Sequence, residues 1–158
     1  MLAIRIHETG GPEKLRGEEI PVPPPRAGEV RFRVEAAGVN FIDTYHRSGL
    51  YKVELPHTLG SEAAGVVTAL GEGVTGIRVG DRIASARTSG AYAQEATVAA
   101  LHAVGVPEGV SVPTAAALQP KLRCRSGITA LTANHGEVPA SCASTSTGST
   151  RRGAPSSE

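Results

Sequence analysis

The sequence predicts a mainly β domain, a closed or partly closed barrel with few short helices. Several short segments alternate apolar and polar residues with the period of two that is typical of half-buried strands. Glycines stand between these segments, where turns between strands require them, and helical patterns are scarce. The chain has 158 residues, 40% of them hydrophobic, which is enough for one domain and too few for two of ordinary size.

The first three strands are expected before residue 37. Residues 2–6 alternate and are followed by a Gly-Gly-Pro turn, and a second strand should precede the three prolines at 23–25. Residues 30–36 show the clearest alternation, with charged side chains on the face opposite to the core. The expected inward-facing residues of the two alternating strands are Leu2, Ile4, Ile6, Val30, Phe32, Val34 and Ala36.

Three later strands are expected at 63–70, 78–84 and 92–98. The glycines that separate them, where tight turns need positive φ, are Gly71, Gly73, Gly76, Gly80 and Gly90.

Helix is expected at two places only. Residues 41–47 are long enough for about two turns, and residues 114–119 begin a second helix with Ser111 as its N-cap. Pro120 should end this second helix, because proline in a helix interior costs about 3 kcal/mol.

One segment, residues 71–76, matches the GxGxxG spacing of dinucleotide-binding turns. A true fingerprint opens a helix whose N-terminus holds the pyrophosphate, whereas residues 77–83 alternate like a strand. Glu72 would also place a carboxylate where phosphates approach. We therefore interpret the segment as a β-hairpin.

The composition changes sharply near Gln119. Residues 1–118 carry 11 basic and 13 acidic residues and all five aromatics, whereas residues 119–158 carry five basic, two acidic and no aromatic residues. The last part is rich in Ser, Thr, Gly and Arg and has too few apolar residues to offset ordering entropy of about 1–2 kcal/mol per residue. We expect a domain at 1–118 and a C-terminal tail that is disordered from about residue 137.

Charge and targeting signals exclude several classes of protein. A net charge of +1 and only five aromatics argue against nucleic-acid binding. No apolar run reaches the roughly 18 residues of a membrane span, and no signal-peptide core is visible, so we expect a cytoplasmic protein. Cys124 and Cys142 have neither the spacing of a zinc site nor that of a disulfide framework.

Three blocks of sequence resemble the N-terminal part of a zeta-crystallin-type quinone oxidoreductase of the medium-chain dehydrogenase/reductase superfamily. They are GVNFIDTY at 38–45, RSGLY at 47–51 and LGSEAAG at 59–65. Further matching blocks are HETGGPE at 7–13, VGDRI at 79–83, GAYA at 90–93 and AAAL at 115–118. The resemblance implies a GroES-like, partly open β-barrel, which in this family is normally followed by a Rossmann domain that binds NADPH.

The resemblance stops after Leu118. The family continues with a helix and a glycine-rich phosphate loop, whereas this chain reads Gln119-Pro120-Lys121-Leu122 and contains no such loop. We interpret residues 119–158 as a divergent tail, either frame-shifted or maintained, so that the Rossmann domain is missing. On this reading the chain alone is a truncated reductase and inactive.

Zinc-dependent relatives in the superfamily hold their metal with cysteine, histidine and carboxylate ligands. The matching positions here are Asn40, Ser61 and Glu62. One carboxylate and two neutral side chains do not make a catalytic zinc site, so we expect a zinc-independent protein.

By resemblance, the nicotinamide end of NADP(H) is expected to contact Asn40, Phe41, Ile42, Asp43, Thr44 and Tyr45. The substrate cleft is expected to include Tyr45, Tyr51 and Glu62, and no catalytic residue is assigned. Asn40 and the Tyr45 hydroxyl are the candidate hydrogen-bond partners of the cofactor or of a quinone-like substrate.

Each of these residues also has a simpler structural interpretation. Asn40 could cap the turn after a strand, and Asp43 could form a local hydrogen bond or an ion pair with Arg47. The tyrosines could serve packing, and Glu62 could pair with a cation or line the cleft.

Two functions from different classes follow. In the first, the chain derives from an NADPH-dependent reductase of quinones or related carbonyls. In the alternative, it is a non-catalytic interaction module that pairs with another subunit through an uncovered apolar interface around residues 115–118 and the edge of the cleft.

Overall fold

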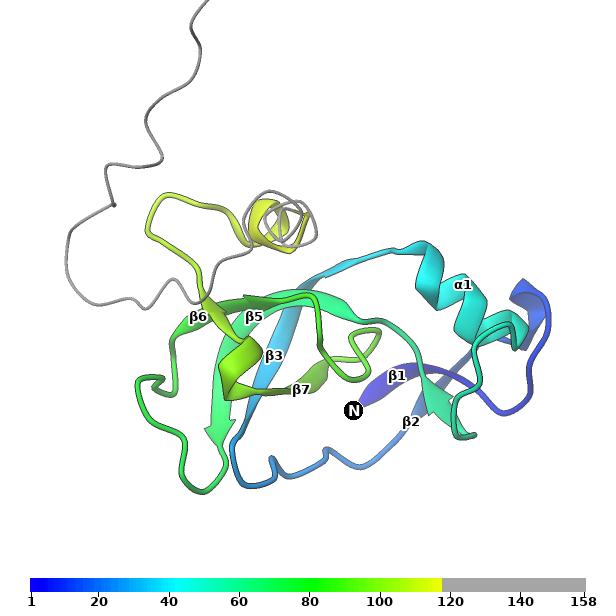
Figure 1. The fold of residues 1–158 in the computed structure, drawn as a ribbon, viewed down its shortest axis with the longest axis horizontal. Helices are drawn as coiled ribbons and strands as arrows, with labels where there is room; N and C mark the ends of the chain where they lie inside the picture. Colours follow the sequence, from blue (N-terminus) through cyan, green and yellow to red (C-terminus); the bar gives the residue numbers. More distant parts are fainter. Residues whose placement is uncertain (118–158) are drawn as a thin grey trace, which may run out of the picture.

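The computed structural model describes residues 1–117, which form two antiparallel β-sheets (Figure 1). The three-stranded sheet has the order β2 (Arg16–Glu19), β1 (Leu2–Ile6), β4 (His57–Thr58). The five-stranded sheet has the order β7 (Glu95–Ala99), β3 (Glu29–Gly38), β5 (Glu62–Leu70), β6 (Arg82–Ser85), β8 (Val104–Gly105). The two sheets do not close on each other, which confirms the mainly β, partly open architecture.

Short helices connect the strands. The α-helix α1 (Phe41–Ser48) follows β3 and lies at the end of the molecule remote from β6 (Figure 1). Two 3-10 turns, η1 (Pro12–Lys14) and η2 (Ala100–His102), and a helical segment at 112–117 complete the described elements. As expected, the Ser111 hydroxyl accepts the Thr114 N–H at 3.2 Å and caps that last segment.

The core lies on the inner face of the five-stranded sheet. Val30 and Phe32 of β3 are fully buried and pack with Val67 of β5 and Ile83 of β6. Alternation along β3 leaves Arg33 exposed on the other face, as the sequence pattern predicts. A second, smaller apolar cluster contains Ala64, Ala84, Val112, Ala115 and Ala116.

The inner face of β1 differs from the prediction. Leu2 is 46% exposed and Ala3 is 1% exposed, so the small residue takes the buried position. Ala3 forms a bridge with Ala93, and the Ile4 N–H donates to the Tyr92 carbonyl at 2.7 Å. The segment at 92–94 crosses close to β1 here, and alanine leaves room for this approach.

The GxGxxG segment is a turn between antiparallel strands, as predicted, because β5 pairs with β6. Gly73 and Gly76 both have φ of 77°. Gly71 does not have positive φ; it is required because a side chain there would collide with the Arg26 carbonyl oxygen.

Two predicted strands begin too early. The strand expected at 78–84 starts at Arg82, because Arg78 and Asp81 form a turn closed by the Asp81 carboxylate, which accepts the Arg78 N–H at 2.7 Å. The strand expected at 92–98 starts at Glu95, because residues 92–94 leave the five-stranded sheet to reach β1. The expectations for residues 119–158 lie outside the described residues.

Candidate functional site

The site begins at the junction between β3 and α1. Asn40 takes the N-cap position with extended backbone, and its N–H donates to Asp43 Oδ2 at 2.9 Å. This is the reciprocal half of a capping box, in which the side chain at N3 satisfies a backbone donor at the helix start. The helix ends at Gly49, whose φ of 86° reverses the chain toward Tyr51.

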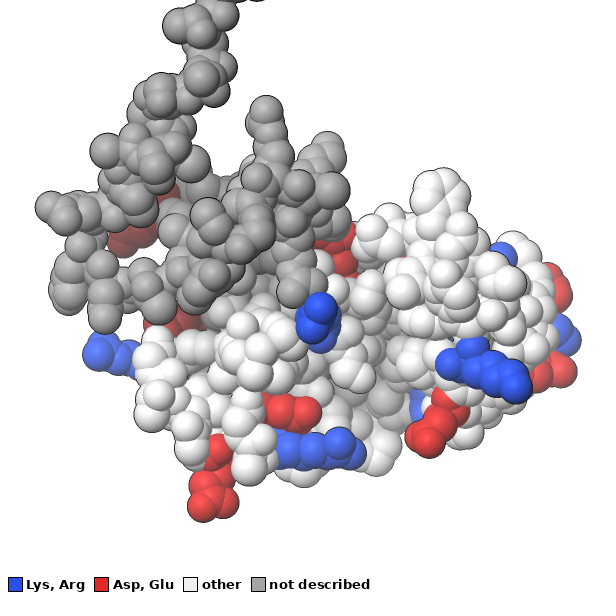
Figure 2. Space-filling view, viewed as in Figure 1, with Lys and Arg blue, Asp and Glu red and all other residues white. Residues whose placement is uncertain are grey.

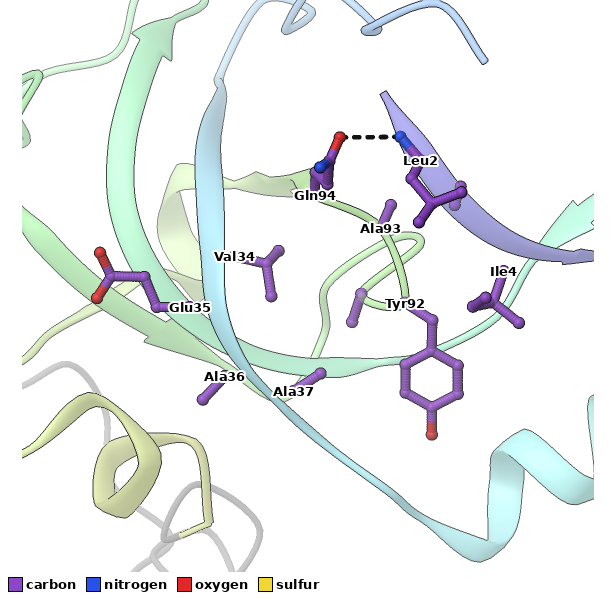
Figure 3. Close-up of a pocket in the computed structure, with 11 residues that line it drawn as sticks. Leu2, Ile4, Val34, Glu35, Ala36, Ala37, Tyr92, Ala93 and Gln94 are labelled. Atoms are coloured by element: carbon purple, nitrogen blue, oxygen red, sulfur yellow. Dashed lines mark hydrogen bonds between the residues drawn. The ribbon is translucent and has the colours of Figure 1, made fainter. Parts of the chain in front are cut away.

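Two side chains from other elements contact this helix start, the half-buried Tyr92 and the buried Glu62. The Tyr92 hydroxyl donates to Asp43 Oδ2 at 2.7 Å, and Asn40 Nδ2 donates to Glu62 Oε2 at 2.8 Å. Asp43 and Glu62 are each only 4% exposed. Figure 3 shows the Tyr92 ring extending from the 92–94 segment toward the chain that leads from β3 into α1. The structure therefore assembles four polar side chains under the first turn of α1.

Burial dominates the electrostatics of this network. It raises the pKa of Glu62, and the nearby Asp43 charge raises it further, while the hydrogen bond from Asn40 opposes both effects. Burial also raises the pKa of Tyr92, followed by its hydrogen bond to Asp43, so the phenol keeps its proton and remains a donor. Among the described atoms, Asp43 Oδ1 and Glu62 Oε1 are buried without a hydrogen-bond partner.

Two glycines make room for the network. A Cβ at position 38 would lie 2.6 Å from the carboxyl carbon of Glu62. A Cβ at position 60 would lie 2.7 Å from Cδ1 of Tyr92, and Gly60 also has φ of 93°. Larger residues at either position would displace one of the two side chains that contact the start of α1.

The outer side of α1 and the loop after it are apolar and open to solvent. Phe41 is 81% exposed, Tyr45 37% and Tyr51 52%. The Tyr45 and Tyr51 rings meet edge to face with centroids 5.4 Å apart. Figure 2 shows a largely uncharged surface over α1. Val39 and Leu50 extend this surface, which we call the α1 apolar face and define as Val39, Phe41, Ile42, Tyr45, Leu50 and Tyr51.

The predicted site residues thus divide into two layers. Phe41, Ile42, Tyr45 and Tyr51 belong to the exposed layer, and Asp43 and Glu62 to the buried layer, with Asn40 between them. The Thr44 hydroxyl is used within the helix, where it donates to the Phe41 carbonyl at 2.6 Å.

The structural interpretations of Asn40 and Asp43 are confirmed in part. Asn40 caps α1, and Asp43 makes the local hydrogen bond, although with Asn40 and Tyr92 as donors and without an ion pair to Arg47 among the described ion pairs. Sequence reasoning missed Tyr92 and Gly38 as site residues. The available signals were the GAYA block, which contains Tyr92, and the GVNFIDTY block, which begins at Gly38.

Neither metal ligation nor a membrane span is indicated within residues 1–117. No group of three or more His, Cys, Asp or Glu side chains in this part of the chain is arranged to hold a metal ion. No helix in the same range has the length and apolar character needed to cross a bilayer.

A shallow apolar pocket of about 320 Å³, open to solvent, lies beside the network, and Tyr92 forms part of its wall (Figure 3). It is lined by residues of β1, of the C-terminal half of β3 and of the segment at 91–94. Val34 of β3 points toward the side of the pocket on which Leu2 and Ile4 lie, where the two sheets diverge (Figure 3).

Comparison with known proteins identifies relatives of the described part of the chain. The family profile of the alcohol dehydrogenase GroES-like domain matches residues 26–119. The quinone oxidoreductase of Salmonella typhimurium is 47% identical over 116 residues, which are 72% of this chain and 36% of that protein. A 2-haloacrylate reductase from a Burkholderia species is 42% identical over 117 residues, covering 71% of this chain and 35% of that protein.

The same relationship is seen in three dimensions. The structure of Escherichia coli quinone oxidoreductase, solved in complex with NADPH, superposes with a TM-score of 0.72 at 42% identity. The match covers 74% of this chain and 36% of that one. The chain therefore spans about a third of the length of the curated relatives it matches.

Proposed function

The chain belongs to the alcohol dehydrogenase GroES-like domain family, and from this membership we propose that residues 1–118 are the catalytic-domain portion of a zinc-independent quinone oxidoreductase. The sequence identity of 47% to a quinone oxidoreductase supports this function. The structural observation that carries it is the exposed aromatic surface of α1 above a hydrogen-bonded polar network that includes the buried Asp43 and Glu62. NADP(H) is the proposed cofactor and a quinone-like carbonyl compound the proposed substrate.

The described residues fit one end of such a cofactor. Phe41, Tyr45 and Tyr51 offer aromatic surface for a flat ring, and the half-buried Asn40 amide lies beside them. The turn at 71–76 joins two strands and opens no helix, so it offers no N-terminus to phosphates. This part of the chain would thus hold the nicotinamide end and leave the phosphates to other residues.

NADPH, when bound, supplies the hydride for carbonyl reduction. The residues of this chain would orient and shield the reacting groups. When a ligand covers them, Phe41 and Tyr45 would exclude water from one side of the cleft, which would strengthen polar interactions inside it. Asn40 is fixed by Glu62, so its amide offers hydrogen bonding in a set position and loses little entropy on binding.

The donor chemistry supports a reaction without zinc. Asn40 stands where the zinc-dependent relatives have cysteine, and its amide is engaged with Glu62 at 2.8 Å. Zinc prefers thiolate, imidazole and carboxylate ligands. Glu62 is the only one of the three matching positions with such a ligand.

Titration with the two halves of the cofactor tests this proposal. In nitrogen-15 NMR spectra of the 158-residue chain, nicotinamide mononucleotide should shift the amide signals of residues 40–45. Adenosine 2′,5′-bisphosphate is the matched control and should leave both this segment and residues 71–76 unchanged. Phe41→Ser should weaken the nicotinamide response, whereas Leu101→Ser, an equally exposed apolar position at 80%, should not. Absence of any response to the nicotinamide half would reject the proposal.

Activity provides a second test. Because these residues form one wall of the cleft, we expect negligible oxidation of NADPH by the purified 158-residue chain with a simple quinone. Turnover at the rate of an ordinary enzyme, on the order of 10 per second, would contradict this expectation.

The α1 apolar face also favours a second candidate function, in which the chain pairs with another subunit. Val39 and Phe41 are more than four-fifths exposed, at 82% and 81%, and contiguous exposed apolar surface is typical of interaction sites. Size-exclusion chromatography distinguishes the two cases. A monomer whose behaviour is unchanged by Phe41→Ser would argue against the interaction module.

A further inference from the structure

We infer that Tyr92 and Glu62 are positioning residues of the site: together they fix the first turn of α1 and so set where Asn40 and Phe41 meet a ligand. The purpose of this positioning rests on the proposed function. The positioning itself is a property of the chain without ligand.

The first reason is that apolar packing does not hold α1. Of its eight residues only Asp43 is buried, and Phe41, Ile42 and Tyr45 are exposed. Isolated helices this short are marginal in water, and most helices are stabilised by packing an apolar face. Since the apolar residues of α1 face outward, much of the stabilisation of the helix must come from the polar contacts at its start.

The second reason is that these contacts come from parts of the fold that are distant in sequence. Tyr92 reaches Asp43 across 49 positions of sequence, and Glu62 reaches Asn40 across 22. Glu62 is the first residue of β5, the strand next to β3 in the larger sheet. Tyr92 belongs to the segment that bridges to β1. The helix start is therefore tied to both sheets.

The third reason is that the hydrogen bonds from Tyr92 and from Glu62 both act on Asn40. Asp43 Oδ2 accepts both the Tyr92 hydroxyl at 2.7 Å and the Asn40 N–H at 2.9 Å. Asn40 in turn donates its side-chain amide to Glu62. Asn40 is thus held through its backbone by way of Tyr92 and through its side chain by Glu62.

At the opposite end, α1 is held by backbone hydrogen bonds and by ring contacts, since the His46 ring centroid lies 5.7 Å from that of His57 and 6.4 Å from that of Tyr51. The Gly10 N–H donates to the Arg47 carbonyl at 2.9 Å, and the Tyr51 N–H donates to the Tyr45 carbonyl at 3.2 Å. A change at Tyr92 or Glu62 should consequently loosen the first turn and leave the last turn in place.

Amide hydrogen exchange on the full chain tests this inference. Tyr92→Phe removes one hydroxyl, and Tyr45→Phe is the matched control because that ring is partly exposed. We expect exchange at the Asn40 N–H to accelerate at least tenfold in Tyr92→Phe, which corresponds to about 1.4 kcal/mol. Exchange in the core, at Val67 and Ile83, should change much less.

Glu62 is tested in the same way. Glu62→Ala should shift the side-chain amide signals of Asn40 and accelerate exchange at its N–H, and Glu62→Gln should restore both because the amide oxygen still accepts a hydrogen bond. If Tyr92→Phe does not fold, this pair of variants still tests the inference.

A purely structural role would give a different pattern. If Tyr92→Phe accelerated exchange equally at Asn40 and in the core, the residue would contribute only to global stability and the inference would be wrong. Unchanged exchange at Asn40 in both variants would overturn it as well. Failure of nicotinamide mononucleotide to shift residues 40–45 of the unaltered chain would instead reject the proposed function, and leave the exchange result valid.

Discussion

Replacement of Gly38 by alanine probes the contact between β3 and Glu62. The three atoms nearest to the new Cβ would all belong to Glu62, with the carboxyl carbon 2.6 Å away where ordinary contact begins at 3.4 Å. The carboxyl carbon must therefore retreat by about 0.8 Å, and Oε2, which lies closer still to the new Cβ, must retreat farther. Glu62 is 4% exposed, so it has little free space, and we expect the 2.8 Å bond from Asn40 to be lost.

The magnitude follows from two opposing effects. A hydrogen bond to a charged group contributes about 1.5–3 kcal/mol. Alanine in place of glycine stabilises by about 0.4–1 kcal/mol where the backbone permits it, and Gly38 lies in β3 without positive φ. We expect Gly38→Ala to lower the free energy of unfolding by about 1–2 kcal/mol.

A double-mutant cycle isolates the cause. In a Glu62→Ala background the obstructing carboxylate is gone, so Gly38→Ala should become stabilising by about 0.4–1 kcal/mol. Urea unfolding of the four chains measures both values. An equal loss of stability in the two backgrounds would show that the alanine is opposed by something other than Glu62, and would refute the reasoning.

Further predictions concern pH and the core. Burial raises the pKa of Glu62 above 4.5, so its contribution to the free energy of unfolding is present in acid and is lost as the pH rises through the pKa of the folded state. Glu62→Gln should therefore gain stability relative to the unaltered chain when urea unfolding is repeated at rising pH, from 4.5 to neutral. Burial, followed by the charges of His46 and Arg5, lowers the pKa of His57 below 6.5. Stability should therefore fall as pH decreases below 6.5, and less so in His57→Gln; an identical slope in both chains would contradict this. Phe32→Ala should cost about 3–5 kcal/mol in urea unfolding, because the ring is fully buried, and a loss below 1 kcal/mol, about what an exposed site gives, would argue against the described core.

Much of the fold could be predicted from local sequence. The alternation at 30–36 places Val30 and Phe32 inside because side chains of a strand alternate between faces. Gly73 and Gly76 take positive φ as expected, since tight turns need it. The strand expected at 78–84 was wrong at its start because the Asp81 side chain closes a turn, and such a bond competes with the weak apolar pattern around Val79, which is 62% exposed.

The sequence by itself determined that this is a β domain resembling quinone oxidoreductases, and it predicted that residues 40–45 belong to its site. It could do so because alternation, turn glycines and ordered motif blocks are local properties of the chain. Only the tertiary structure decided that Asp43 and Glu62 are buried, and that Tyr92, 49 residues away, donates to Asp43. Such contacts depend on how two sheets meet, and no local pattern records which distant side chain completes a buried polar network.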